Sequence, residues 1–400
     1  MRDLVLRIDA ATPPGRDRAV DALRALAILG VVLGHWLVSA LVVDSGTMHV
    51  ASPLRAMPHL APVSWLLQTL AVFFLVGGLA GAKSLAAARA RDVTYFRWLG
   101  ARMSRLFRPV AAVLAVWAVA AVAMLAFGTD SGTVRALVKL VVSPLWFLLV
   151  FAALTAGTPL AARLHPLVPL AVVALVDLVR YGLGGPAWLG WVNVAAGWLV
   201  PYCLGAAWTR GAMRSRGTGW ALVVGGVTAT AGLVLLAGYP ADMVGVPGAA
   251  VSNLDPPTIA AVTFGLAQCG VALLLLGRLR RILRRRITWA AVALVNLSAM
   301  TIFLWHQTAM MAVSAIGLLG GEPLPGLHTV PDGPGWVLAR LAWLPAFAAA
   351  LLVCSAAFRT YERGTPGNRG SAEGEGPASA LRWTSPIKDS KVANGAWGES

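Results

Sequence analysis

Long apolar segments constrain this chain more than any other feature of its sequence. Blocks such as Ala22–Leu41 and Val110–Phe127 approach the roughly 20 residues that an α-helix needs to cross the hydrocarbon core of a bilayer. Hydrophobic residues make up 58% of the chain and charged residues only 12%, which is about half the charged share of soluble domains. We therefore expect an all-α, polytopic transmembrane helix bundle, and not a soluble enzyme, a disordered protein or an outer-membrane barrel.

Ten segments meet the length and composition rule for a membrane span. The predicted spans are 20–43, 60–82, 109–127, 141–162, 167–183, 187–209, 219–238, 257–277, 288–318 and 335–357. The fifth is short, and the ninth is long enough to be tilted or broken. The membrane domain then covers residues 19–360, between a cytoplasmic segment 1–18 and a disordered cytoplasmic tail 361–400 that is rich in Gly, Ser, Pro and charge.

The distribution of basic residues predicts the orientation of these spans. With the N-terminus in the cytoplasm, 28 of the 33 Lys and Arg residues fall on the inner side. Such a bias places both termini in the cytoplasm of a multi-pass plasma-membrane protein. The net charge of +16 then reflects topology and contact with lipid headgroups, so we expect no nucleic-acid partner.

Ionisable residues inside predicted spans are candidates for function, because burying them in a bilayer is costly. Arg24 and His35 are eleven residues apart, which places them on one helix face and about 16 Å apart along the axis. The pair can be a snorkelling arginine with a helix-packing histidine. Alternatively, it can join a cytoplasmic anion to a buried base.

Two other spans contain polar residues. The ninth carries Asn296, His306 and Gln307, which can hydrogen-bond neighbouring helices or line the same cavity as the histidine of the first span. The fifth carries Asp177 and Arg180, whose spacing favours a self-neutralising structural pair. Asp177 also remains a candidate for a polar site.

A basic stretch, Tyr95–Pro109, precedes the third span. Its Arg102, Arg105 and Arg108 share one face if the stretch is helical. They can be a topology signal with lipid contact, or a cradle for phosphate, which Arg binds in bidentate fashion. The second basic run, 278–286, is interpreted as a topology anchor. The six histidines are scattered and the three cysteines lie in apolar segments, so we expect no metal site.

Several stretches together resemble the acyltransferase-3 family of multi-spanning membrane proteins. They occur in family order and cover about residues 16–360. The stretches are RDRAVDALRALAILGVVLGHW (Arg16–Trp36), Ala71–Leu85 with Ala101–Pro109, Pro144–Leu160, Ser252–Ala260 and MTIFLWHQT (Met300–Thr308). One place departs from close relatives, which often have His-Gln before Leu-Gly in the sixth helix, whereas this chain has Pro201-Tyr202-Cys203.

The resemblance implies an O-acyltransferase that takes an acyl group from cytoplasmic acyl-coenzyme A, with no bound cofactor. The acceptor would be a hydroxyl of a sugar, glycan, lipid or natural product. Arg24 and His35 would be essential, and the Arg102 and Arg105 region would lie on the donor side. A multi-spanning transporter or flippase of a lipid-linked or small polar substrate is the alternative, and the sequence leaves the acceptor, acyl chain and oligomeric state open.

Roles for the candidate residues follow from their chemistry. A neutral His35 can act as general base, because the unperturbed pKa of histidine, about 6.5, suits neutral pH. A covalent acyl-histidine is the variant. His306 is the second catalytic candidate. Donor binding is assigned to Arg24, Arg102, Arg105 and Arg108. Acceptor or oxyanion contacts are assigned to Asn296, Gln307 and Asp177.

Overall fold

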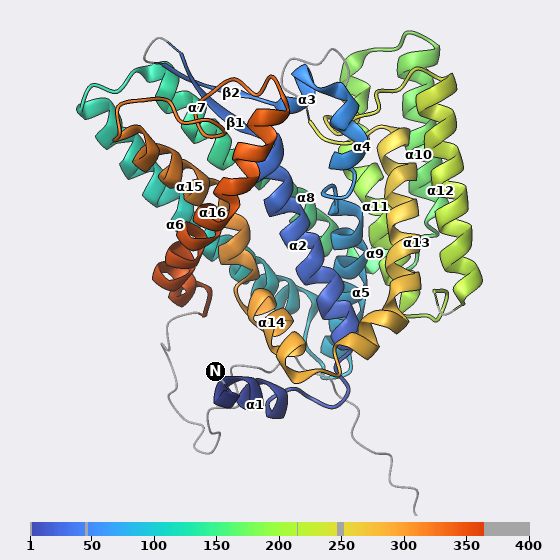
Figure 1. The fold of residues 1–400 in the computed structure, drawn as a ribbon. Coiled ribbons are helices and arrows are strands. Elements are labelled where there is room, and N and C mark those ends of the chain that lie inside the picture. The colour runs from blue at the N-terminus through green and yellow to red at the C-terminus, as the bar shows by residue number, and fades with distance from the viewer. Residues whose placement is uncertain (1, 45–46, 214, 246–251, 364–400) are drawn as a thin grey trace, which may run out of the picture.

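The computed structural model describes residues 2–44, 47–213, 215–245 and 252–363 of the chain. Within them the fold is an all-α bundle with one small β-hairpin, which confirms the predicted class (Figure 1). The longer helices are α2 (Arg18–Val38), α5 (Leu70–Arg89), α6 (Tyr95–Ala126), α8 (Leu145–Ala156), α10 (Leu167–Asp177), α11 (Trp191–Trp208), α12 (Arg216–Leu236), α13 (Ile259–Ile282), α15 (Ala299–Leu318) and α16 (Pro334–Arg363).

Shorter elements connect or cap these helices. They are α1 (Arg2–Ala10), α3 (Pro53–Ala56), α4 (Ala61–Ser64), α7 (Ser131–Val142), α9 (Thr158–Ala161), α14 (Arg286–Leu297), the 3-10 helices η1 (Pro58–Leu60) and η3 (Ala187–Gly190), the π-helix η2 (Leu178–Gly182) and the strands β1 (Ala40–Asp44) and β2 (Thr47–Ala51). The tail expected to be disordered lies, from residue 364 onward, outside the described residues.

Side-chain caps fix where several long helices begin. Asp17 starts α2, Thr94 starts α6, Ser215 starts α12 and Thr258 starts α13, each accepting a hydrogen bond from a backbone N–H of the first turn. These acceptors satisfy donors that have no partner inside the helix. The cap on α2 matters most here, because this helix carries both Arg24 and His35.

Nine helical segments of the described chain are long and apolar enough to cross a membrane. The predicted span that falls short is 167–183. There α10 has 11 residues and continues only through η2 to Gly182, although it packs against α11. The predicted ninth span is broken: α14 ends at Leu297 and α15 begins at Ala299.

Several predicted spans have boundaries that differ from the structure. The third, expected to begin at residue 109, is part of α6, which begins at Tyr95. The first was expected to reach residue 43, but α2 ends at Val38 and the chain continues into β1, which pairs antiparallel with β2. The second was expected to begin at residue 60, but α5 begins at Leu70 after α3, η1 and α4, each of which has Pro in its first turn. Proline favours helix starts and disfavours helix interiors, so it divides this apolar stretch into short pieces.

Both described ends of the chain lie toward the same end of the bundle. In Figure 1, α1 and the last turns of α16 are found near one end, and the β1–β2 hairpin lies at the opposite end. The assignment of that end to the cytoplasm stays a prediction.

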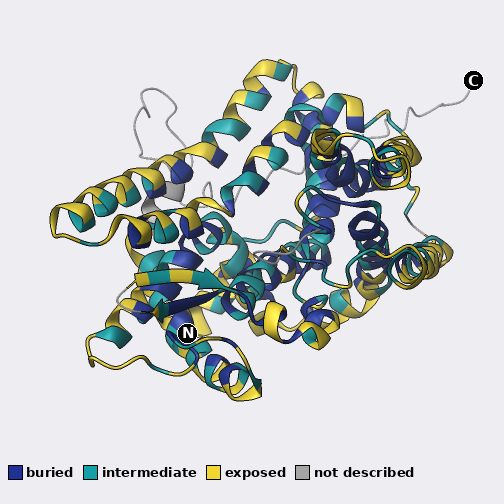
Figure 2. Cartoon of the chain, turned by 90° about the horizontal axis from the view of Figure 1, so that it is seen from above, coloured by how far each residue is buried: buried dark blue, intermediate teal, exposed yellow. Residues whose placement is uncertain are grey.

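Close backbone contact at small residues holds α5 against α11 in the interior. A Cβ added at Gly78 would overlap the backbone of Tyr202, and one added at Gly205 would overlap the backbone of Leu75. Glycine at both positions therefore allows the two helix axes to approach, as is common between membrane helices. Figure 2 shows buried residues gathered inside the bundle and exposed ones on the outer faces of the helices. Exposed apolar residues such as Val119, Leu236 and Leu352 suit contact with lipid.

Candidate functional site

Helix α2 places Arg24 and His35 on one face, as the spacing predicts. The helix runs without a break from Arg18 to Val38, so their axial separation is about 16 Å. Arg24 lies near the end of the bundle that carries α1, and His35 lies one turn before the end that carries the hairpin. The two residues therefore mark two distinct polar regions joined by one helix.

The first region, which we call the histidine end, brings α2 together with α15. The rings of His35 and His306 have centroids 5.1 Å apart. Gln307 Nε2 lies 3.2 Å from Nδ1 of His35, and Nδ1 of His306 lies 2.5 Å from the carbonyl oxygen of Phe303. His306 and Gln307 are fully buried, whereas His35 retains accessible surface. The structure thus groups three residues that the sequence could not place together.

Two polar atoms at the histidine end have no hydrogen-bond partner among the described residues. They are Nε2 of His306 and Oε1 of Gln307. A buried polar group without a partner destabilises the fold by about 1–3 kcal/mol. His306 Nδ1 donates to the carbonyl oxygen of Phe303, so its Nε2 is an acceptor, as is Oε1 of Gln307. Both atoms are therefore available to a hydrogen-bond donor of a ligand, such as a hydroxyl group.

The position of α2 at the histidine end depends on contacts that sequence reasoning missed. Trp36 Nε1 donates to the carbonyl oxygen of His306 at 2.9 Å, which ties α2 to α15. Arg340 of α16 is buried and donates to the carbonyl oxygens of Trp36, Ser39 and Gly326 at 2.6–2.9 Å. In the sequence, Arg340 is a charged residue near the start of the last apolar span. The charge distribution along the sequence identifies it only as one of the basic residues on the outer side of the membrane.

The second region, the arginine end, is a hydrogen-bonded network around Arg24. Arg24 Nε donates to Oδ1 of Asn296 at 2.6 Å, and Arg24 Nη2 lies 3.2 Å from Oδ1 of Asp21. Asn296 Nδ2 donates to the carbonyl oxygens of Asp21 and Val292. Asn296 was expected near the acceptor or an oxyanion. It instead lies level with Asp21, about 21 Å along α2 from His35, since ten residues of helical chain already separate Asn296 from His306 by about 15 Å.

The basic stretch before the third span is part of α6, so its arginines share a helix as expected. Arg102 donates to Oγ of Ser84 on α5 and stacks over Trp98, 5.4 Å from the ring centroid. Arg105 is exposed and donates to the carbonyl oxygen of Ala101, and Arg108 is exposed. Arg102 therefore points inward between α5 and α6, and the other two face outward.

Asp177 belongs to a separate polar cluster around α10 and α11. Its carboxylate accepts hydrogen bonds from Asn193 Nδ2, the hydroxyl of Tyr239 and the backbone N–H of Ile259 at 2.7–3.2 Å. Burial and the nearby carboxylate raise the pKa of Tyr239, so its hydroxyl stays protonated and donates. The expected ion pair with Arg180 is not formed, since Arg180 stacks over Tyr181 instead. Asp177 therefore joins two helices and a loop and does not lie with the histidines.

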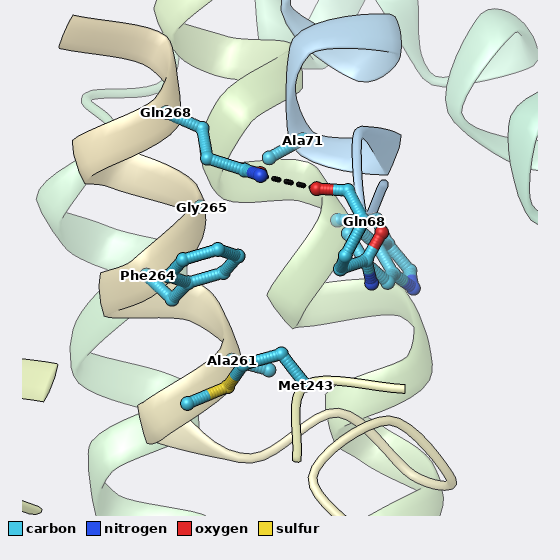
Figure 3. Close-up of a pocket in the computed structure, with 8 residues that line it drawn as sticks. Gln68, Ala71, Met243, Ala261, Phe264, Gly265 and Gln268 are labelled. Carbon is cyan, nitrogen blue, oxygen red and sulfur yellow. Dashed lines mark hydrogen bonds between the residues drawn. The ribbon is translucent and has the colours of Figure 1, made fainter. Parts of the chain in front are cut away.

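A small polar pocket between α5, α11 and α13 is also separate from the histidines (Figure 3). Gln268 Nε2 donates to the backbone oxygen of Gln68, and the indole Nε1 of Trp198 is buried without a partner. The departure from the resembled family at Pro201-Tyr202 lies deeper in α11. The hydroxyl of Tyr202 is 2.7 Å from Oγ1 of Thr158 and is buried, so this residue packs helices together.

The described residues contain no group of three His, Cys, Asp or Glu side chains that could hold a metal ion. The model of an acyltransferase domain, that of the acyltransferase-3 family, matches residues 17–359. The chain belongs to the acyltransferase-3 family. No curated protein and no solved structure matches it. The matched segment begins at Asp17, the N-cap of α2, and ends in the last turns of α16. The chain is therefore a membrane acyltransferase.

Proposed function

We propose that this acyltransferase moves an acyl group from acyl-coenzyme A to a hydroxyl of a sugar, glycan, lipid or natural product. The observation that carries the proposal is the pairing of His35 with His306 and Gln307 at one end of α2, with Arg24 at the other end. A titratable base and a cationic site joined by one helix suit a long, anionic donor that enters from one side. We place the protein in the plasma membrane with Arg24 toward the cytoplasm.

The proposed reaction uses His35 as general base. The acceptor hydroxyl gives its proton to the imidazole while its oxygen attacks the thioester carbonyl carbon. The resulting oxyanion can accept a hydrogen bond from an amide N–H of Gln307. The C–S bond then breaks, the acyl ester forms, and the thiolate takes the proton from the imidazolium. In the covalent variant, the imidazole nitrogen attacks the thioester first and the hydroxyl then attacks the acyl-histidine.

Gln307 determines which nitrogen of His35 accepts the proton. With the amide Nε2 facing the ring, as here, Nδ1 accepts a hydrogen bond from Gln307 and the neutral ring carries its proton on Nε2, so neither nitrogen is free to take a proton from the acceptor hydroxyl. If the amide turns by 180°, its Oε1 faces Nδ1–H and Nε2 becomes the basic atom. Gln307 is therefore a positioning residue for the base.

The donor arm would follow α2 from its arginine end. Arg24 is held by Asp21 and Asn296 so that its guanidinium stays near the bundle end. Arg102 lies on the neighbouring α6 and is also directed inward. Two inward arginines at one level are suited to the phosphates of a nucleotide donor.

Purified protein tests the proposal with an acyl-coenzyme A carrying a labelled acyl group. Binding of the labelled donor and transfer to a panel of hydroxyl acceptors are measured on the native protein and on His35→Gln. We expect donor binding in both and transfer in the native protein only. Absence of donor binding by the native protein would contradict the proposal and favour a transporter.

A further inference from the structure

A basic pocket adjoins the arginine end, at the end of the bundle that carries α1, because Asp21 pairs with both Arg24 and the pocket residue Arg16. It is a cavity of about 330 Å³ between the chain that enters α2 and the last turn of α13. Arg16, Arg18, Arg280 and Arg284 line it together with one acidic residue, Asp17. Its volume is within the range of small-molecule sites, and its charge selects an anion.

Three of these arginines are held in place by carboxylates. The pairs are Arg16–Asp21, Arg18–Asp9 and Arg280–Asp17, with N···O distances of 2.5, 2.8 and 2.6 Å. Burial opposes the charge on Asp17, but the hydrogen bond and charge of Arg280 outweigh it and lower the pKa of Asp17. Arg284 is exposed and forms no ion pair with any described residue. The pocket therefore contains three arginines held in position by carboxylates and one arginine, Arg284, that is free to bind a ligand.

The pocket is close to the donor side of the proposed function. Lys83 near the end of α5 lies close enough to Asp17 to favour its charged form. The next residue, Ser84, accepts the hydrogen bond from Arg102. Two basic sets thus flank the end of α5, one at Arg102 and one in the pocket. A ligand with two separated phosphate groups matches this arrangement better than a single phosphate does.

Coenzyme A is such a ligand, because it carries a diphosphate and a separate 3′-phosphate on its ribose. We propose, on the basis of the function proposed above, that the pocket binds the 3′-phosphate while Arg102 and Arg24 face the diphosphate. The pocket then recognises the donor as coenzyme A. Lipid headgroups also carry phosphate, but a phosphodiester has one charge, whereas a terminal phosphate has about 1.5–2 at neutral pH. The terminal phosphate therefore gains more from Arg284, which has no ion-pair partner among the described residues, beside the three paired arginines.

Donors that differ only in this phosphate give a direct test. The Michaelis constant is measured for acyl-coenzyme A and for acyl-3′-dephospho-coenzyme A, with the protein in nanodiscs of zwitterionic lipid. We expect the native protein to prefer the full donor by about tenfold, the usual value of one charged hydrogen bond. Arg284→Glu should bring the ratio of the two constants close to one by raising the constant for the full donor.

Arg281→Glu is the matched control. Arg281 is exposed and belongs to the same basic run, but it does not line the pocket. The charge change is identical, so a topology effect or a general loss of positive field would act equally in both variants. We expect Arg281→Glu to keep the native ratio. If Arg284→Glu fails to accumulate, Arg284→Gln is measured against Arg281→Gln.

Three outcomes overturn the proposal. One is a native ratio close to one, and another is an equal change in both variants. The third is a native ratio in Arg284→Glu together with weaker retention of phosphatidylglycerol, which assigns the pocket to lipid. Calorimetry with adenosine 3′,5′-bisphosphate distinguishes a failure of this proposal from a failure of the proposed function. If the native protein binds this nucleotide and Arg284→Glu weakens the binding, the phosphate site is supported even when no acyl transfer is found.

Discussion

The two ends of α2 differ in how completely their polar groups are satisfied. At the arginine end, Arg24, Asp21 and Asn296 form a closed network of hydrogen bonds. At the histidine end, His306 and Gln307 are fully buried and each leaves one polar atom without a partner. Buried polar groups without a hydrogen-bond partner lower the stability of the fold. Their presence here suits a position where a bound substrate forms the missing hydrogen bonds. The comparison suggests that the arginine end holds the structure and binds, while the histidine end reacts.

The largest expected effect concerns His35. Replacing it by Gln keeps hydrogen bonding but removes the ability to take a proton. General base catalysis contributes about 10²–10⁴-fold, so transfer should fall by that factor while donor binding persists. Initial rates of transfer with labelled donor measure the change. Near-native turnover of His35→Gln would reduce the histidine to a packing residue.

Arg24 comes next, because its removal acts on binding and on structure together. Arg24→Ala removes the guanidinium that donates hydrogen bonds to both Asp21 and Asn296. The affinity for acyl-coenzyme A should fall about 10- to 100-fold. Arg24→Lys keeps the charge but cannot contact both partners as a planar fork, so it should recover only part of the affinity. Equilibrium binding of labelled acyl-coenzyme A gives both values, and full affinity in Arg24→Ala would remove the donor role.

A matched pair of polar-to-apolar changes tests the contrast in stability. Asn296→Leu should lower the free energy of unfolding by about 1–3 kcal/mol, since it strands Arg24 Nε. Gln307→Leu removes one unpartnered atom with its amide, so stability should change by less than about 1 kcal/mol while transfer falls. Thermal unfolding in detergent and transfer rates are measured together. Equal destabilisation by both changes would contradict the comparison.

The smallest effect concerns pH at the arginine end. The pKa of Asp17 is lower in the fold than in the unfolded chain, so its ion pair with Arg280 stabilises above the ordinary pKa of 3.8 and is lost as pH falls through the folded value. The pair is partly exposed, so the contribution is below about 1 kcal/mol. Unfolding of the native protein and of Asp17→Asn between pH 7 and 3 should converge at low pH. A constant difference would contradict this assignment.

Patterns within one helix could be predicted from the sequence, whereas contacts between helices could not. The spacing of Arg24 and His35 follows from helix periodicity, and the arginines of α6 share a helix for the same reason. The contact of His35 with His306 depends on how α2 packs against α15, which hydropathy does not contain. The distance of Asn296 from the histidines could have been predicted, because ten residues of helix separate it from His306 by about 15 Å whether or not the chain breaks at Ser298.

Two other differences have local physical causes. Residues 40–43 are apolar, so the sequence predicts them to be the end of the first span, but they pair with β2 instead, where Val42 and Val43 suit a strand. Arg340 was counted as a loop charge because it lies near a predicted span boundary. Its burial against three carbonyl oxygens follows from the positions of α2 and of the chain before α16, which only the folded structure provides.

The continuous α2 also limits how relatives of this protein can diverge. Inserting or deleting one residue between Arg24 and His35 would rotate one side chain by about 100° relative to the other and shift it by about 1.5 Å. Adjusting neighbouring side chains cannot return both Arg24 and His35 to their original positions. The number of residues between the guanidinium and the imidazole can therefore change only by whole helical turns. Relatives that accept a longer or shorter acyl chain therefore have to differ on the helices that surround α2. There, a single substitution changes the width of the site without changing the distance between the guanidinium and the imidazole.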